Sequence, residues 1–226
     1  MASDDAPSFT PALFTFFKEL AGNNERTWFN ANKARYEQDV KEPALAFVED
    51  VGFRLPDFAP HLVADKKSMF RIYRDTRFAK DKTPYKTHCG IYLRHAAAAD
   101  ADTPGLYLNL EPRNVFMGAG IWHPGSPGLK RIRTAIVNKP EAWRKAIEAA
   151  APTWTLANGE ALKRPPQGFP ADHPLIDDLK RKSFAIMTTL TQTEATGRGF
   201  LEEFETRARL TRPFMTFLSD ALGVDY

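Results

Sequence analysis

Apolar and polar positions in the first quarter of the chain repeat with the spacing of helices. In segments 11–22, 24–40 and 43–54, large apolar residues recur every three or four positions, as they do on the buried face of a helix. Prolines open the first and third segments, where a helix tolerates them, and Asn24 is placed to cap the second. A stretch with two further prolines, 56–60, is expected to end the third helix. We therefore predict a helical N-terminal quarter.

The middle of the chain alternates between apolar and polar residues instead. Four runs, 69–74, 88–94, 106–111 and 115–122, place apolar side chains at every second position, as strands with one buried face do. The segments that link the last three runs are short enough for hairpins. We therefore expect an antiparallel meander over about residues 67–122.

Helical spacing returns after residue 122, with two short strand-like runs between the helices. The expected helices are about 127–137, 140–147, 177–182, 199–210 and 213–222, and the expected strands are 154–156 and 184–190. No internal repeat or long linker divides the chain. We predict a single α+β domain over residues 1–226, with a disordered tail at 1–9 and helices flanking the sheet at both ends.

Composition agrees with a packed domain. The 226 residues are 43% hydrophobic and 12% aromatic, and the lone cysteine, Cys89, excludes an intrachain disulfide and suits a reducing compartment. No apolar run approaches the roughly 20 residues of a membrane span, and the opening MASDDAPS lacks the basic and apolar regions of a secretory signal. We therefore expect a cytoplasmic protein with no membrane partner. The sequence does not indicate an oligomeric state.

Positive charge is concentrated in one segment. Residues 66–95 hold nine Lys and Arg against two acidic residues, a net charge of +7, whereas the whole chain carries +3. The remainder therefore sums to −4. A local excess of positive charge on a near-neutral body favours a site for an anion over a generally basic surface.

The residues expected to contact such an anion lie mostly in this segment. Guanidinium groups bind phosphate or carboxylate through paired hydrogen bonds, ammonium groups add charge, and aromatic rings stack on a ligand ring. Asp75 and Asp81 are expected to orient the arginines rather than to act as bases. The predicted ligand-binding residues are Arg71, Arg74, Asp75, Arg77, Lys80, Lys82, Tyr85, Lys86 and Trp122.

Three interpretations of the basic segment stay open. The first, which we favour, is a basic cleft for a phosphorylated or carboxylated small molecule, with or without catalysis. The second is a nucleic acid, because cations interleaved with aromatic residues can follow a backbone and stack on bases. The third is a structural or protein-interaction domain whose cations pair internally. Neutralisation of the segment by Glu19, Glu25, Glu37 or Glu111 would favour the third.

The polar face of the predicted meander is a second candidate surface. Glycines at 90, 118 and 120 lie on it, and glycine in a strand marks close approach of either a ligand or a packed helix. Helix packing is the favoured alternative of the two, and helices that cover only part of the face would leave a cleft. The other residues of this face are His88, Tyr92, Tyr107, Asn109, Glu111 and Trp122.

Signatures of catalysis and of cofactors are weak. The sequence has no HExxH or CxxC spacing, no GxSxG motif and no dinucleotide-binding fingerprint, so we expect no metal and no cofactor. Cys89 alternates inward on its strand, which predicts a buried thiol. His88 and Glu111 are candidates for an acid–base pair, provided that adjacent strands bring them together. The helix start at 125–128 is a weaker candidate for a second anion site, and an ordinary capped start is the better account.

Three segments of the sequence resemble one protein family. They are NNERTWF at 23–29 with the later Lys33 and Tyr36, RIYRDTRFAKDKTPYKTH at 71–88, and LKRPPQGFPADHP at 162–174 with the later Lys182-Ser183-Phe184. Together they are similar, over nearly the whole chain, to the bacterial and fungal family called domain of unknown function 2461. This resemblance implies no activity, but it groups the three segments, so we expect their cations to converge. Those cations are Lys33, Arg71, Arg74, Arg77, Lys82, Lys86, Lys163 and Arg164.

Overall fold

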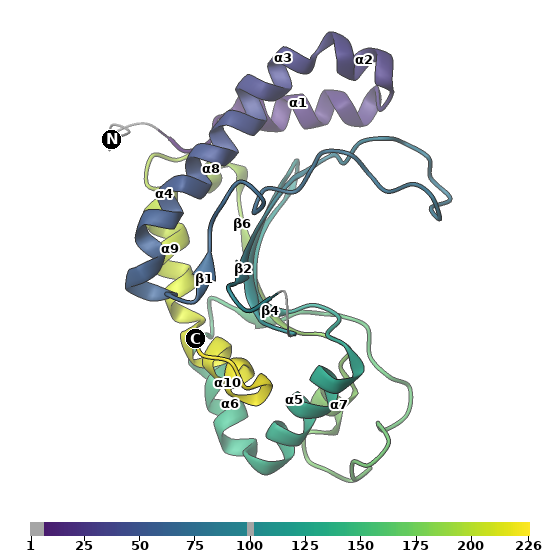
Figure 1. Cartoon of the computed structure of the whole chain (residues 1–226), viewed down its shortest axis with the longest axis vertical. Helices are drawn as coiled ribbons and strands as arrows, with labels where there is room; N and C mark the ends of the chain where they lie inside the picture. The colour runs from purple at the N-terminus through teal and green to yellow at the C-terminus, as the bar shows by residue number, and fades with distance from the viewer. Residues whose placement is uncertain (1–6, 99–101) are drawn as a thin grey trace.

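Six strands form one antiparallel sheet with a packed side and an open side (Figure 1). The computed structural model describes residues 7–98 and 102–226. The strand order is β1-β2-β3-β4-β6-β5, and every neighbouring pair is antiparallel. The strands are β1 (Leu62–Val63), β2 (Cys89–His95), β3 (Gly105–Glu111), β4 (Asn114–Ile121), β5 (Thr155–Leu156) and β6 (Phe184–Leu190).

The central strands β2, β3 and β4 confirm most of the predicted meander, and β6 confirms the later strand. The prediction of a strand at 69–74 is wrong, because this segment makes only isolated bridges, Met69 with Ile91 and Tyr73 with Tyr85. Pro84 has no N–H with which to extend a ladder of hydrogen bonds. Residues 71–87 instead leave the sheet as an extended loop, which we call the basic arm (Figure 1).

Helices flank the sheet at both ends, as predicted for an α+β domain, and others lie in the chain between β4 and β6. No helix within the described residues combines the length and the apolar composition needed to cross a bilayer. The helices are α1 (Pro11–Gly22), α2 (Arg26–Ala31), α3 (Lys33–Tyr36), the π-helix η1 (Glu37–Lys41), α4 (Glu42–Phe58), α5 (Ser126–Asn138), α6 (Pro140–Glu148), α7 (Ile176–Lys180), α8 (Gln192–Ala195), α9 (Phe200–Leu210) and α10 (Arg212–Leu222).

Three predictions for the N-terminal quarter need correction. The helix expected at 24–40 is divided into α2, α3 and η1. Pro56 does not end α4, which continues to Phe58 because burial of Phe58 outweighs one lost backbone hydrogen bond. A disordered tail is expected at 1–9, and residues 1–6 of it lie outside the described part of the chain. At residue 9 the expectation is wrong, because Phe9 is fully buried and packs against α4 and α9.

The core lies between one face of the sheet and the helices. Apolar side chains of the alternating runs, such as Ile91, Leu108 and Met117, are at most 1% exposed and belong to one apolar cluster with α1, α4, α9 and α10. Figure 1 shows α4 and α9 on this packed side. On the open side, the basic arm extends from one end of the strands and the segment 157–175 from the other (Figure 1). The face between them holds the candidate site.

Candidate functional site

A cavity of about 610 Å³ lies on the open face of the sheet. We call it the sheet cavity. Gly105, Gly118 and Gly120 belong to its lining, and of these Gly118 is partly exposed whereas Gly105 and Gly120 are buried. Its lining includes six aromatic residues and comes from strands and loops, so the favoured alternative of a helix packed on this face is wrong here. The aromatic residues that line it are Phe70, Tyr92, Tyr107, Phe116, Trp122 and His123.

Glycines position the two tyrosines across the sheet. A Cβ added at Gly90 would lie 2.7 Å from the Tyr107 hydroxyl, and one at Gly105 would lie 2.6 Å from the Tyr92 ring. These positions must therefore be glycine for the rings to occupy their places. Gly118 differs, because the nearest atom to an added Cβ there is the Tyr107 Cβ at 3.7 Å. A side chain at Gly118 would enter the cavity without disturbing the fold.

The aromatic rings contact one another along one wall. Phe70 lies with its ring centroid 6.3 Å from that of Tyr92 and 5.9 Å from that of Tyr107, and Tyr107 lies 5.7 Å from Phe116. Trp122, at the end of β4, is 60% exposed. Such surfaces favour a planar apolar group, because ring stacking adds to the gain from burial.

Polar groups in the cavity are few. The Tyr107 hydroxyl donates to Asn109 Oδ1 at 3.1 Å and is thereby fixed. The Tyr92 hydroxyl and the His123 imidazole make no side-chain hydrogen bond with any described residue. Burial raises the pKa of Tyr107 to about 12 and also raises that of Tyr92, so both are protonated phenols at neutral pH. Tyr92 can therefore donate a hydrogen bond to a ligand.

The helix start at 125–128 is already occupied by a carboxylate of the chain. Asp102 accepts the N–H of Gly125 at 3.0 Å and 3.2 Å, and its side chain lies against Gly128. A negative charge at the start of α5 is favourable because the first amides of a helix have no internal partner. The segment is thus a capped helix start, the account that the sequence favoured, although Ser126 is inside the helix rather than its cap.

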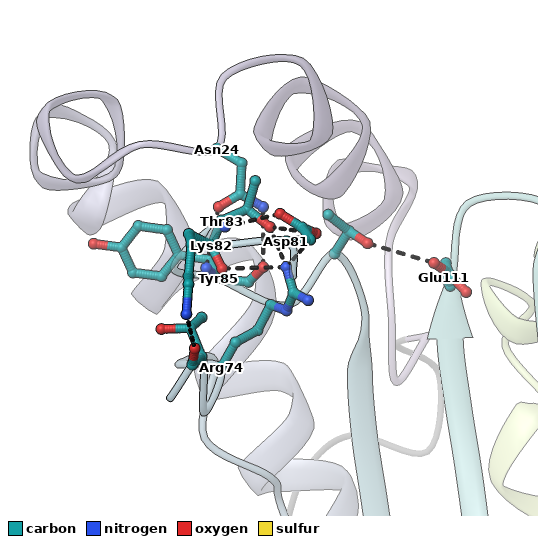
Figure 2. A network of polar contacts seen from close by, with 9 residues as sticks. Asn24, Arg74, Asp81, Lys82, Thr83, Tyr85 and Glu111 are labelled. Carbon is teal, nitrogen blue, oxygen red and sulfur yellow. Dashed lines mark hydrogen bonds and ion pairs between the residues drawn. The ribbon is translucent and has the colours of Figure 1, made fainter. Parts of the chain in front are cut away.

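The basic arm is anchored to the N-terminal helices by Asn24 and Tyr85 (Figure 2). Asn24 Nδ2 donates to the Tyr85 carbonyl at 2.9 Å, and the Tyr85 N–H donates to Asn24 Oδ1 at 3.0 Å. The prediction that Asn24 caps α2 is therefore wrong; Glu25 holds that position without a side-chain bond. Tyr85 is 3% exposed and stacks on Phe29 with centroids 4.1 Å apart, so it anchors the arm and does not face a ligand.

Two arginines of the arm are paired with aspartates of the same arm. Arg74 contacts Asp81 at 2.6 Å and also Thr83 (Figure 2), and Arg77 makes two hydrogen bonds to Asp75, at 2.6 Å and 3.0 Å. The hydrogen bond from the Thr83 N–H and, secondarily, the one from Arg74 lower the pKa of Asp81 to about 2. This geometry matches the expected orienting role of both aspartates, and it leaves the two arginines less available to a ligand.

The other cations of the arm have no carboxylate partner among the described residues. Lys82 donates to the Thr76 carbonyl at 2.8 Å, and Arg71 and Lys80 make no side-chain bond with a described residue. Three glutamates whose pairing with these cations would favour an internal network have other partners. Glu19 pairs with Arg35 and Glu37 with Lys41, and Glu111 accepts from Thr87 and Asn114.

Lys86 connects the arm to the sheet cavity. Its ammonium group lies 5.2 Å from the centroid of the Phe70 ring, which lines the cavity, and donates to the Arg71 carbonyl at 2.8 Å. Burial and, secondarily, the nearby Arg71 lower the pKa of Lys86. Of the predicted ligand-binding residues, Trp122 lines the cavity and Lys86 lies beside it. The remaining predicted residues, Arg71, Arg74, Asp75, Arg77, Lys80, Lys82 and Tyr85, are not part of its lining.

His88 and Glu111 occupy adjacent strand ends but do not bond to each other. The pairing of Cys89 with Leu110 places them opposite one another at one end of β2 and β3. Glu111 accepts instead from Asn114 Nδ2 at 2.9 Å and from Thr87 Oγ1 at 3.4 Å. Neither residue lines the sheet cavity. Within residues 7–98 and 102–226, no three His, Cys, Asp or Glu side chains gather as metal ligands would.

The cations expected to converge are separated instead. Leu162 donates its N–H to the Lys180 carbonyl, which holds the segment 162–174 beside α7. Figure 1 shows this segment and the basic arm at opposite ends of the sheet. Lys163 and Arg164 therefore do not share one basic cavity with the arm. The expected convergence is wrong because the local sequence does not determine the end of the sheet at which a loop lies.

A family model described as a conserved hypothetical protein, DUF2461, matches residues 12–217. The chain belongs to this family. The match includes the arm, the sheet and the helices on the packed side, so the resemblance of the three segments is confirmed. Comparisons with curated proteins and with solved structures gave no match for this DUF2461 chain.

Two aromatic residues of the cavity, Phe116 and His123, are not among the candidates from the sequence, although Phe116 alternates with Gly118 and Gly120 on the same strand face. A signal was present in Trp122 and His123, two aromatic residues placed where an alternating strand ends.

Substitution of Asn24 tests how the arm is anchored. Asn24→Ala should lower the free energy of unfolding by about 2 kcal/mol, because it removes two hydrogen bonds and leaves both polar groups of the Tyr85 backbone unpaired. Urea denaturation measures this change. Asn23→Ala is the matched control, since the Asn23 side chain bonds, among the described residues, only to the Glu19 carbonyl of the preceding helix, and it should cost well under half as much. Equal losses of unfolding free energy in the two variants would contradict the role of Asn24 in anchoring the arm.

His88 should make the stability of the protein sensitive to acid. Burial lowers its pKa, an effect that Glu111 opposes. The unfolded chain therefore binds a proton more readily, so this contribution is complete above the unfolded pKa of about 6.5 and is lost as pH falls through it. Between about pH 7.5 and about pH 5.5, the free energy of unfolding measured by urea denaturation should fall less in His88→Gln than in the unmodified protein. An unchanged loss would show that another group is responsible.

Proposed function

We propose that this protein binds a small molecule with a planar ring and an anionic group, and that the ring occupies the sheet cavity. The cavity itself carries the proposal. Its volume of about 610 Å³ falls within the roughly 300–1,000 Å³ of small-molecule sites. It also combines glycines with aromatic residues in its lining, which suits a flat apolar group.

The anionic group is inferred from the charge beside the cavity. Lys86 lies over Phe70 at the rim, and the neighbouring Arg71 has no carboxylate partner among the described residues. The carboxylate in the lining, Asp102, is held by the start of α5. An anion that reached Lys86 would therefore meet uncompensated positive charge at partial burial, where such interactions are less screened.

A thermal-stability panel tests this proposal. The ligands are sulfate, phosphate, nucleotides, sugar phosphates, naphthalene-2-sulfonate and short oligonucleotides, each at about 50 mM and about 200 mM salt. A ligand at 100 times its dissociation constant adds about 2.7 kcal/mol to the free energy of unfolding. Ring-containing anions should raise the melting midpoint at both salt concentrations, and sulfate should raise it least. A shift with sulfate as large as that with naphthalene-2-sulfonate would contradict a role for the cavity.

Two lysine variants distinguish the cavity from the rest of the arm. Lys86→Gln should weaken naphthalene-2-sulfonate binding about tenfold, in line with the loss of one charge-assisted contact. Lys82→Gln is the matched control, because Lys82 also donates to a backbone carbonyl of the arm but, unlike Lys86, is not packed over an aromatic residue of the cavity lining. It removes the same charge and should leave binding within about twofold. Equal weakening would mean that the ligand follows the charge of the whole arm.

Nucleic-acid binding is the second candidate, and one observation favours it. Phe78 of the arm is 96% exposed between Arg77 and Lys80, and an exposed ring among cations suits base stacking beside phosphates. Under this alternative only oligonucleotides would shift the midpoint, the shift would disappear at higher salt, and Phe78→Ala would weaken it.

A further inference from the structure

His123 has a backbone conformation that side chains rarely adopt. Its φ is +49°, in the left-handed region, which costs a residue other than glycine roughly 1 kcal/mol. The conformation is held by Ser183, a 6% exposed residue whose hydroxyl accepts the His123 N–H at 2.9 Å. Such strain persists where surrounding structure enforces it, and it is concentrated at functional sites.

The enforced turn places the imidazole at the sheet cavity. His123 lines the cavity, and its ring lies edge-on to Trp122 with centroids 5.4 Å apart. The ring makes no hydrogen bond with a described residue, so its nitrogens are available. Trp122 is 60% exposed, and Gly159 lies beside its ring. His123 is an exposed residue of the cavity lining, and Ser183 holds its backbone.

His123 and Lys86 lie at opposite ends of the cavity. Phe70, beneath Lys86, bonds through its N–H to the Gly90 carbonyl near the start of β2. His123 follows the end of β4, which runs in the same direction as β2 because both pair antiparallel with β3. A ring lying across the cavity would therefore present one edge toward Lys86 and the other toward His123.

We propose that His123 binds a second acidic group of the ligand, so that the ligand class is a planar ring with acidic groups at opposite ends. This inference rests on the proposed function of the cavity. Imidazole is the side chain that ordinarily gains a proton between about pH 8 and pH 5, and its protonated form donates from both nitrogens. The second acidic group should therefore be held more strongly as pH falls.

Two carboxylates lie near His123 in the fold. Glu160 is nearby, and its pKa is lowered first by Lys182, which it contacts at 2.8 Å, and further by His123. Asp102 is held by the Gly125 N–H two residues along the chain. Each of these carboxylates therefore has a partner of its own in the fold.

A matched pair of probes tests the inference by calorimetry. Naphthalene-2-sulfonate carries one acidic group and naphthalene-2,6-disulfonate carries two at opposite ends of the same ring. In the unmodified protein, the disulfonate should bind about tenfold more tightly than the monosulfonate at about pH 5.5, and the advantage should fall to about twofold at about pH 8. His123→Asn should lose the advantage at both pH values. Asparagine tolerates the left-handed backbone, so this variant keeps the turn.

His88→Asn is the control for the other histidine on this face, and it should retain the pH-dependent advantage. Retention of the advantage in His123→Asn, or its loss in His88→Asn, would overturn the assignment. Monosulfonate binding without any pH-dependent gain from the second group would overturn this inference and leave the proposed function standing. No binding of either probe to the unmodified protein would overturn both.

Discussion

Gly120→Ala is expected to lower the free energy of unfolding by on the order of 3 kcal/mol. Gly120 has a φ of +123°, a conformation that strains any residue with a side chain. An added Cβ would also overlap the carbonyl oxygen of Phe184 and would lie 2.9 Å from the Cα of Ala185. Gly120 pairs with Ala185 in the β4–β6 ladder, so relief of the overlap would have to separate two central strands.

The adjacent position on the same face supplies the control. Gly118→Ala places a Cβ at 3.7 Å from its nearest neighbour, an ordinary contact, and alanine restricts the unfolded chain more than glycine does. It should leave stability within about 0.5 kcal/mol or raise it slightly. Urea denaturation of both variants measures the difference. Similar losses of unfolding free energy in the two variants would mean that the strand tolerates alanine at neither position. The special backbone conformation of Gly120 would then not explain its loss.

Tyr85→Ala is expected to cost on the order of 3 kcal/mol, a loss typical of truncating a buried aromatic side chain. Tyr85 is 3% exposed and packs between Phe29 and Tyr73, with centroids 4.1 Å and 5.5 Å away. The substitution should also release the arm, because the Tyr85 ring is what packs the arm against the N-terminal helices. Hydrogen exchange of the amides in residues 71–87 should therefore become faster.

Two nearby variants separate this role from ligand contact. Tyr85→Phe should stay within about 0.5 kcal/mol, because the hydroxyl makes no hydrogen bond with a described residue. Tyr73→Ala should cost far less than Tyr85→Ala, because Tyr73 is largely exposed. If Tyr85→Ala left stability unchanged but weakened naphthalene-2-sulfonate binding, the residue would belong to the ligand site after all.

Prediction from sequence succeeded where one face of an element is buried. Alternation fixes which side of a strand is apolar, so the inward positions of Cys89, Leu108 and Met117 and the outward glycines followed from the pattern alone. The same logic placed Tyr92, Tyr107 and Trp122 on the face that carries the sheet cavity. Proximity in the chain also made the pairing of Arg77 with Asp75 predictable.

Prediction failed where long-range partners decide the outcome. Asn24 has the composition of a helix cap, but its amide matches the backbone of a residue 61 positions away, which no local pattern reveals. Tyr85 was assigned to a ligand because its neighbours are cations, whereas Phe29 buries it. The end of the sheet at which segment 162–174 lies depends on strand order, so the predicted convergence of Lys163 with the arm was wrong.

The central claim is that a ligand ring occupies the sheet cavity, and Gly118→Val tests it most directly. Valine suits a strand, and its branches would project into the cavity. Thr189→Val is the control, because Thr189 is an exposed residue of β6 outside the cavity lining. The measurement is the affinity for naphthalene-2-sulfonate by calorimetry. We expect a loss of at least about tenfold in Gly118→Val and none in Thr189→Val, whereas unchanged affinity in a folded Gly118→Val would place the ligand elsewhere.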